Sequence, residues 1–522
     1  MLAILFSWII IFFVLFTMGH FFVYIYNTVC KRNEQYSLID TFLLGLFFAA
    51  MLLSLSSFWL ASNHYILLAY HYAHIRWNEE YPLIPGIGNL EDRFGFNSNY
   101  FLLSAIFTFR TFLGYPLYTV QSMVAVLVFC WILIEVFRSK YELKRVILFI
   151  VSIVYFYYEY RSIGDTSTDI IPGLISFFIL SRIILYPDTF KRDYLIYIFV
   201  PLAVVAFKVS AAPLALISLF ALIEAVKGKE YKVSVFICFV LFIYFMLWIV
   251  RTIIISGYIV YPIYEIDLFS FDWKAPQEIA VKQRYMIDYF ANAYVVESVK
   301  VGLAMHKKYY YILVFIYLLA FASIPLGIYY AVKNKNKTYL YAIITLIVCL
   351  CYWFFFAHDF RFGSGYVFTA IFLGIISVMD NRYWIFPKLS MAVIVLLISW
   401  MTIFSVRSAS YYWDYLDRYE LNAIERFTRM IKMPYNVKDK MIEVKSSETP
   451  PDNFSFTPYK LNNGLSINIS SYHCGWCFDS IPAIPDINIV PEFWTARKPE
   501  SIQARSNSLK DGFRTNYDFY NK

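Results

Sequence analysis

Long apolar segments separated by short polar loops dominate the chain. Runs of about 20 apolar residues, long enough to cross a hydrocarbon core of about 30 Å, recur from the first residues to the region of residue 405. Inside lipid the backbone must satisfy its own hydrogen bonds, so these runs have to be helices, and the alternating polarity of β-barrel strands is not seen. The pattern predicts an all-α polytopic membrane protein with about 12 transmembrane helices. We expect them at 2–28, 37–61, 113–137, 145–160, 168–186, 193–209, 211–226, 233–255, 309–332, 338–357, 365–380 and 386–405.

The charges of the loops predict the orientation of these helices. Lys and Arg concentrate in every second loop, near residues 31–32, 138–145, 191–192, 227–232, 333–337 and 382–388. The alternate loops carry fewer basic residues and include the two longest, 62–112 and 256–308. Because basic loops stay in the cytoplasm, both long loops and both termini are expected on the extracytoplasmic face. The first apolar run is too long for the core of a signal peptide, so we expect it to be the first membrane helix.

The composition narrows the class of protein further. Of the 522 residues, 60% are hydrophobic and only 16% are charged, whereas about a quarter of the residues of a soluble domain are charged. The net charge of +8 is spread over short loops and forms no basic cluster with interleaved aromatic residues. Composition therefore excludes a soluble protein and argues against nucleic acid as a partner; the expected surroundings are membrane lipid.

Two domains are expected, a transmembrane domain over 1–405 and a small extracytoplasmic C-terminal module over 406–522. The tail contains a CxxC motif formed by Cys474 and Cys477. A redox motif of this kind should open a helix after a strand, and its flanking segments do not predict one. We therefore expect a disulfide between Cys474 and Cys477, typical of an oxidising compartment. No metal site is expected there, because further ligands at suitable spacing are missing.

The first long loop contains the most informative sequence. Residues 63–80 have the pattern of an amphipathic helix, and Tyr70, Trp77 and Tyr81 are placed for a membrane interface. A cluster of Pro and Gly at 82–88 predicts a tight turn. A second short helix is expected at about 98–109, before the chain re-enters the membrane.

This loop arrangement resembles that of the GT-C glycosyltransferases, membrane enzymes that take a sugar from a polyprenyl-phosphate carrier. A closer similarity to a bacterial family of GT-C-like multi-pass proteins is carried by YHYAHIRWNEEYPLIPGIGNLEDRFGFNSNYFLLSA (70–105), FKVSAAPL (207–214) and VRTIIISGYIVYP (250–262). The resemblance covers most of the chain. It implies a GT-C-like fold in the bacterial cytoplasmic (inner) membrane, a polyprenyl-phosphate-linked sugar as donor and an envelope glycan or glycolipid as acceptor. It implies no cofactor and leaves a divalent metal open.

One position departs from the family pattern. In GT-C transferases an Asp four residues before a Tyr on the first loop helix takes the proton of the acceptor hydroxyl. Aligned on Tyr70, that position is Ile66 in this chain, which cannot accept a proton. Either the alignment is shifted, the base comes from another segment, or the reaction is different.

Glycosyl transfer needs a base for the acceptor and cations for the departing phosphate. Three aspartates on the expected outer face are the catalytic candidates: Asp92, Asp165 and Asp169. The resemblance implies an acid in the loop before the predicted span 168–186, which favours Asp165 or Asp169. The alternatives are a helix N-cap for Asp169 and a salt bridge with Arg93 for Asp92.

The cationic candidates lie at the outer ends of predicted spans. Lys208 stands between two apolar runs, where an unpaired charge is costly, although its side chain could instead extend to the interface. Arg251 and Arg361 occupy comparable positions. The remaining candidates for substrate or phosphate binding are in the first loop: His71, Arg93 and Asn97.

These features predict an inverting transferase of the GT-C type, acting at the outer face in cell-envelope polysaccharide biosynthesis. Two alternatives stay open. A polysaccharide polymerase or ligase acting on lipid-linked repeats would share the many spans and a large outer loop. A transporter or flippase would need ionisable groups at midspan, and the candidates Glu135, Arg182 and Glu224 lie near span ends.

Overall fold

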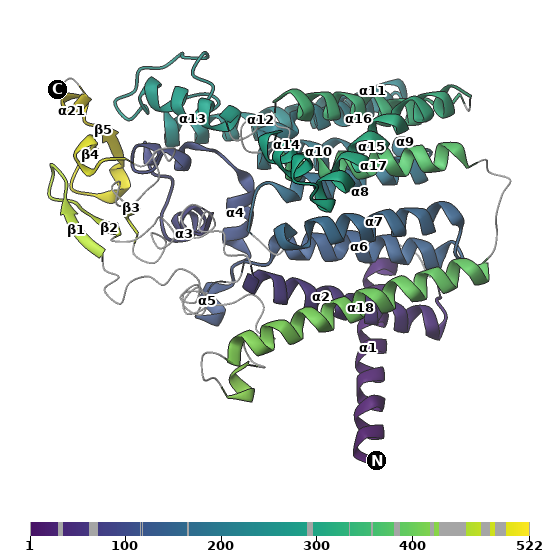
Figure 1. Cartoon of the computed structure of the whole chain (residues 1–522). Helices are drawn as coiled ribbons and strands as arrows, with labels where there is room; N and C mark the ends of the chain where they lie inside the picture. The colour runs from purple at the N-terminus through teal and green to yellow at the C-terminus, as the bar shows by residue number, and fades with distance from the viewer. Residues whose placement is uncertain are drawn as a thin grey trace.

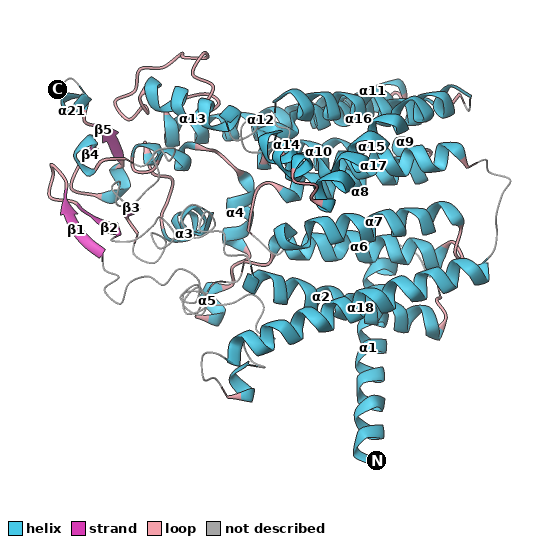
Figure 2. Cartoon of the chain, in the orientation of Figure 1, coloured by secondary structure: helices cyan, strands magenta, loops and turns pink. Residues whose placement is uncertain are grey.

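The computed structural model describes residues 2–29, 35–61, 71–114, 116, 118–163, 166–289, 296–333, 335–356, 359–379, 387–417, 422–426, 456–470, 481–485 and 497–520. Most of these residues are helical, and short strands occur near the C-terminus (Figure 2). Among the described residues, eight segments are long and apolar enough to cross a membrane. They are α2 (Leu38–Ala61), α6 (Val120–Arg138), η4 with α11 (Val209–Leu214 and Ala215–Lys227), α12 (Tyr231–Ser256), α15 (Lys308–Lys333), α16 (Lys337–Phe356), α17 (Phe360–Val378) and α18 (Pro387–Asp417).

Further helices complete the apolar part of the chain. The shorter apolar helices are α8 (Ile170–Leu185) and α10 (Tyr194–Phe207), and α1 (Leu2–Val29) and α7 (Leu143–Ile163) are also largely apolar. Figure 1 shows most of these helices side by side in one bundle, with α1 crossing their direction and projecting from it. The chain is therefore mostly helical, with the apolar helices of a membrane-embedded protein. The number of about 12 spans, the orientation of the termini and the GT-C fold stay predictions.

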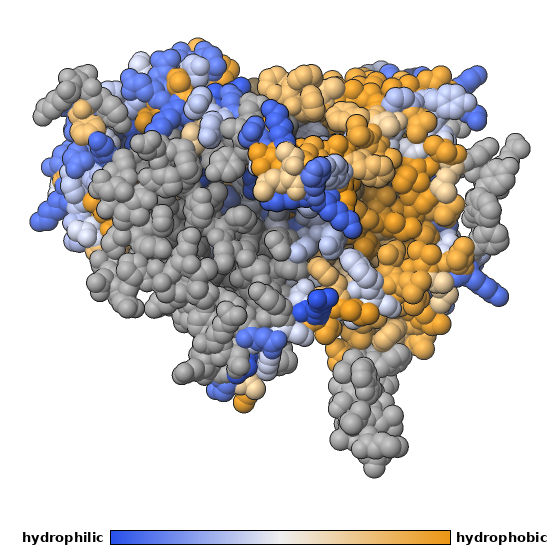
Figure 3. All heavy atoms as spheres, in the orientation of Figure 1, coloured by the Kyte–Doolittle hydropathy of each residue, from blue (hydrophilic) through white to orange (hydrophobic). Residues whose placement is uncertain are grey.

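Polar and apolar surfaces separate along the bundle. In Figure 3 the helical part presents mainly hydrophobic residues, whereas hydrophilic residues gather at the end where α13 (Gln277–Tyr289) and the C-terminal strands lie. The outer helices expose large apolar side chains, among them Phe236 and Phe242 on α12 and Phe315 on α15. Such exposure is expected of helices that face lipid, because lipid tails are as apolar as these side chains.

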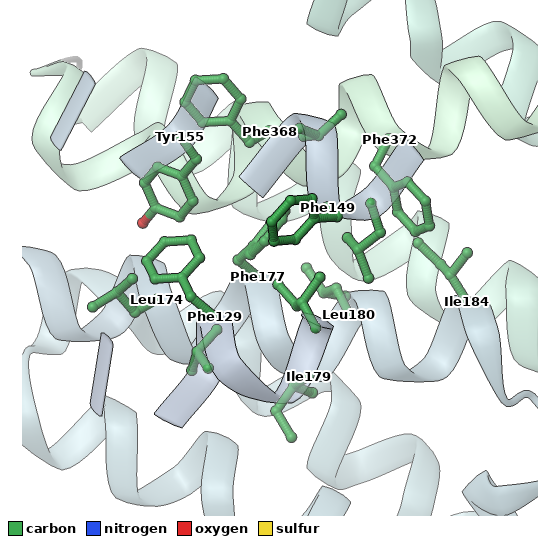
Figure 4. Close-up of a cluster of buried hydrophobic side chains, with 14 of the residues drawn as sticks. Phe129, Phe149, Tyr155, Leu174, Phe177, Ile179, Leu180, Ile184, Phe368 and Phe372 are labelled. Atoms are coloured by element: carbon green, nitrogen blue, oxygen red, sulfur yellow. The ribbon is translucent and has the colours of Figure 1, made fainter. Parts of the chain in front are cut away.

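The interior of the bundle is packed by aromatic and branched side chains. Tyr155 of α7 stacks on Phe368 of α17 with ring centroids 5.0 Å apart, and Phe177 of α8 meets Tyr155 edge-on (Figure 4). All three side chains are buried. In lipid such contacts, rather than removal from water, hold helices together, so this cluster fixes α7, α8 and α17 relative to one another.

Two glycines let α8 and α17 approach closely. A Cβ built on Gly365 would overlap the carbonyl oxygen of Gly173, so the two backbones are in contact at this crossing. Small residues at helix contacts permit this approach in membrane proteins. The crossing lies four residues after Asp169 at the start of α8 and four residues after Arg361 at the start of α17, and it therefore brings these two helix starts together.

The polar end of the bundle is built from both long loops and the C-terminal tail (Figure 1). The first loop forms α3 (Tyr72–Glu80), η2 (Ile87–Asn89), η3 (Asp92–Gly95), α4 (Asn99–Ile106) and α5 (Arg110–Leu113), and the second forms α13 and α14 (Glu297–Ala304). The tail adds a three-stranded sheet of β1 (Phe456–Lys460), β2 (Ser466–Ser470) and β3 (Ala483–Pro485), in which β2 pairs antiparallel with β1 and parallel with β3. A two-stranded antiparallel sheet joins β4 (Ile502–Ala504) to β5 (Phe513–Thr515), and α21 (Tyr517–Tyr520) follows.

The tail and the first loop share one hydrophobic core. Ile467, Ile484 and Phe513 of the tail pack in the same buried cluster as Tyr72 and Trp77 of α3. Trp77 is only 4% exposed, so the expected placement of this residue at a membrane interface is wrong. Its indole ring is covered by the loop itself, because the apolar face of α3 finds partners in the loop and the tail rather than in lipid.

Candidate active site

Asp169 and Lys208 meet at the polar end of the bundle. Asp169 immediately precedes α8, and Lys208 lies between α10 and η4, where its ammonium group donates a hydrogen bond to the Asp169 carboxylate. The Asp169 side chain makes no capping hydrogen bond, so the N-cap alternative is wrong. Lys208 also lies over the ring of Phe362, 3.5 Å from its centroid, a cation–π contact that stabilises the ammonium group away from water.

A second ion pair extends this cluster. Arg361, at the start of α17, donates from Nε and Nη2 to the Asp359 carboxylate at 3.1 and 2.7 Å. Its Nη1 lies 3.8 Å from Asp169. Asp359 also caps α17 by accepting the backbone N–H of Arg361. Two cations and two carboxylates from separate segments thus form one cluster, which we call the ionic cluster (Asp169, Lys208, Asp359 and Arg361).

Access differs within the ionic cluster. The Arg361 side chain is 46% exposed, whereas those of Asp169 and Lys208 are 19% and 20% exposed. Lys208 keeps further N–H donors besides the one given to Asp169, and the Nη1 group of Arg361 forms no hydrogen bond with the described residues. The cluster can therefore accept an added anion from the Arg361 side.

The electrostatic field of the cluster is reflected in two pKa values. Burial raises the pKa of Asp169, but Lys208 and Arg361 outweigh it and hold this pKa well below its usual range. Burial lowers the pKa of His71, which precedes α3, to about 3, against an opposing effect of Asp169. At neutral pH the site therefore presents an ionised Asp169 beside a neutral His71, and the structure brings these two predicted residues together.

Asp92 lies in a different setting. Its carboxylate accepts a hydrogen bond from Nε of Arg497 at 2.6 Å, and both side chains are at most 1% exposed. The alternative partner Arg93 is therefore not the one that the structure gives to this carboxylate. Asn89 lies beside the pair and joins Arg497 and Thr515 of the tail to the first loop. Asp92 thus holds the tail on the loop.

Arg251 and Asn97 also meet, as a link between loop and bundle. Arg251 of α12 donates to the side-chain oxygens of Asn97 and of Asn78, the latter at 2.9 Å. Asn97 donates in turn to the Trp248 carbonyl at 2.7 Å. Arg93 lies near enough to His71 to influence its charge state. These contacts join Arg251 of α12 to Asn97 of the first loop and to Asn78 of α3.

Comparison with known proteins identifies a family for this chain. A family described as a domain of unknown function (DUF8201) matches residues 1–69 and 68–368. The chain belongs to this family. No curated protein and no solved structure matches the chain. The DUF8201 match contains the whole ionic cluster and His71, whereas Arg497 lies beyond it.

Some predicted residues fall outside the part that the structure describes. These are Asp165, Ile66, Tyr70, Cys474 and Cys477. Within the described residues no group of three or more His, Cys, Asp or Glu side chains is arranged to hold a metal ion.

Two residues in or near the ionic cluster were not selected from the sequence. Phe362 makes a cation–π contact with Lys208. No local sequence pattern predicts this contact, because the two residues lie far apart in the chain. Glu159 of α7 is buried near Arg361 and Asp359. An acidic residue inside an apolar run was a visible signal for Glu159, since such residues are costly in a membrane and tend to be functional.

Proposed function

We propose that this protein is a membrane transferase of the GT-C type, which moves a sugar from a polyprenyl-phosphate donor to an envelope glycan or lipid acceptor at the outer face of the membrane. The observation that carries the proposal is the meeting of Lys208, Arg361 and Asp169 from three separate segments at the polar end of an apolar bundle. The resemblance of the first loop supports it independently.

The chemistry of the cluster fits a phosphate leaving group. Charge develops on the phosphate oxygen as the glycosidic bond breaks, and fixed cations stabilise that charge most where water is scarce. Arg361 offers exposed N–H groups from a planar guanidinium, and Lys208 adds a compact charge held by Phe362. Arg361 lies at the start of α17, and Lys208 lies between α10 and η4. A lipid-linked phosphate would reach these positions from the membrane.

The pairing of Asp169 defines its part in the proposal. A carboxylate held by two cations at a low pKa is a weak proton acceptor. Asp169 therefore serves to position Lys208 and Arg361, with the neutral His71 beside it. The predicted catalytic role of Asp165 stays a prediction.

The test is sugar transfer by the purified chain in lipid nanodiscs, supplied with labelled polyprenyl-phosphate sugars and a crude glycolipid acceptor fraction. The proposal expects a labelled product from the wild type. Lys208→Ala and Arg361→Ala should each reduce transfer by about 10²-fold or more. The matched control is Lys227→Ala, which removes a lysine paired with Glu224 at the opposite end of α11 and should leave transfer unchanged.

The outcomes separate the alternatives. Label found in longer polymers of a lipid-linked repeat would favour a polymerase or ligase, and label carried across the bilayer without a new bond would favour a flippase. Transfer that survives both Lys208→Ala and Arg361→Ala would show that the ionic cluster is not the phosphate site.

A further inference from the structure

Glu159 is a buried acid within electrostatic range of Asp359 and Arg361 of the ionic cluster. It lies one turn before the end of α7, and its residue is only 2% exposed. Its polar neighbours include the hydroxyl groups of Ser364 on α17 and Ser162 on its own helix. Ser364 follows Arg361 by three residues, so Glu159 faces α17 about one helical turn deeper in the bundle than Arg361.

The Glu159 carboxyl group has no fixed ionic partner. Its Oε1 is buried and accepts no hydrogen bond from the described residues, and no Lys or Arg among them lies within 4 Å of it. Arg361, the cation within electrostatic range, is engaged by Asp359 and Asp169. A buried carboxyl group without an ionic partner carries a substantial energetic cost, which natural proteins retain mainly at functional positions.

The charged and titratable groups around Glu159 come from two other helices and from its own. Asp359 and Arg361 face it from the start of α17, and Tyr309 and Tyr317 face it from α15. Tyr155 lies one turn away on α7. Among the described acids of this site, Glu159 is thus the one without a directly bound cation.

We infer that Glu159 is the proton acceptor of the transfer reaction, an assignment that rests on the proposed function. The acceptor O–H bond breaks and its proton passes to the Glu159 carboxylate, while the acceptor oxygen forms a bond to the anomeric carbon. The bond from that carbon to the phosphate oxygen breaks, and its electron pair leaves with the polyprenyl phosphate between Lys208 and Arg361. Charge and atoms balance without a further reactant, and Asp169 stays ionised throughout.

Transfer kinetics of Glu159→Gln and Glu159→Asp test this inference in nanodiscs. Glu159→Gln should lower kcat by about 10²–10⁴-fold, the usual contribution of a general base. It should leave the binding of unlabelled polyprenyl phosphate, measured by displacement of the labelled donor, within about twofold of the wild type. Glu159→Asp should retain part of the activity and displace the acidic limb of the pH profile. The matched control is Glu224→Gln, which alters a largely buried carboxylate at the opposite end of α11.

A second measurement does not depend on transfer. The infrared carboxylic-acid band of the wild type should titrate with pH, and Glu159→Gln should lack one titrating component that Glu91→Gln retains. Full transfer by Glu159→Gln, or an unchanged infrared titration in that variant, would overturn the assignment while leaving the proposed function intact. Failure of the wild type to transfer any sugar would instead count against the proposed function.

Discussion

At the scale of single residues, the pairing of Asp169 with Lys208 sets the properties of the candidate site. Each partner is about four-fifths shielded from solvent, so removing one leaves the other charge poorly compensated. Asp169 also contacts Arg361, so its loss would free two cations together. The pair is therefore expected to behave as a unit.

A double-mutant cycle on Asp169→Asn and Lys208→Met tests this coupling. Each single change should reduce transfer by about 10²-fold, and the double variant should lose less than the product of the two, because contacting charges are non-additive. Transfer kinetics in nanodiscs give the coupling directly. Strictly multiplicative losses would show that the two residues act separately.

Glu91 provides a pH-dependent prediction at the same scale. Burial, followed by repulsion from Asp92, raises the pKa of Glu91 to about 8. A carboxyl group whose folded pKa lies above its unfolded value of about 4.3 stabilises the fold at low pH, and this stabilisation is lost as the pH rises through the folded pKa. Stability of the loop should therefore fall between about pH 4.5 and pH 8.

Glu91→Gln should remove that dependence. We expect the variant and the wild type to unfold at similar temperatures at pH 5, and the variant to unfold several degrees higher at pH 9. Thermal unfolding in nanodiscs at the two pH values measures the difference. The same gap at both pH values would contradict the titration of Glu91.

At the scale of helices, the contact of Gly173 with Gly365 determines where α8 and α17 begin relative to each other. The apolar runs and their approximate bounds follow from hydropathy, which is why the sequence predicts the helices well. Sequence spacing alone does not reveal that Gly173 faces Gly365, since the two lie on different helices. It likewise does not reveal that Phe362 supports Lys208.

Gly365→Ala should increase the distance between α8 and α17 at their crossing. The added methyl group would overlap the Gly173 carbonyl oxygen, so α17 must shift and the contact between Arg361 and Asp169 must lengthen. We expect a lower unfolding temperature and transfer reduced by about 10-fold or more, since small displacements at a site are costly. The control is Gly228→Ala, which alters the residue that follows the C-terminal end of α11. Normal transfer by Gly365→Ala would indicate that the crossing does not position the ion pair.

At the scale of the whole molecule, the C-terminal tail is an integral part of the polar end. Arg497 and Asp92 are 405 residues apart in the chain and fully buried against each other. Phe513 donates its backbone N–H to the Pro85 carbonyl, and Arg505 pairs with Asp272 of the second loop. The sequence predicted a small C-terminal module but not its contacts, because its pattern contains no sign of a partner so distant along the chain. In the structure, residues of the tail and of the first loop share one hydrophobic core.

This integration makes the tail essential to the stability of the first loop. Arg497→Met leaves the Asp92 carboxylate buried without its cation, at an expected cost of about 3–5 kcal/mol. Adding Asp92→Asn should recover much of that loss, because the uncompensated charge is then gone. Arg505→Met, which alters an exposed pair in the same tail, should have little effect. Thermal unfolding in nanodiscs ranks the variants by stability. Transfer should follow the same order, because α3 packs against the tail and His71 immediately precedes α3. If Arg497→Met were as stable as Arg505→Met, the buried pair would not hold the tail on the loop, and the shared hydrophobic core alone would have to do so.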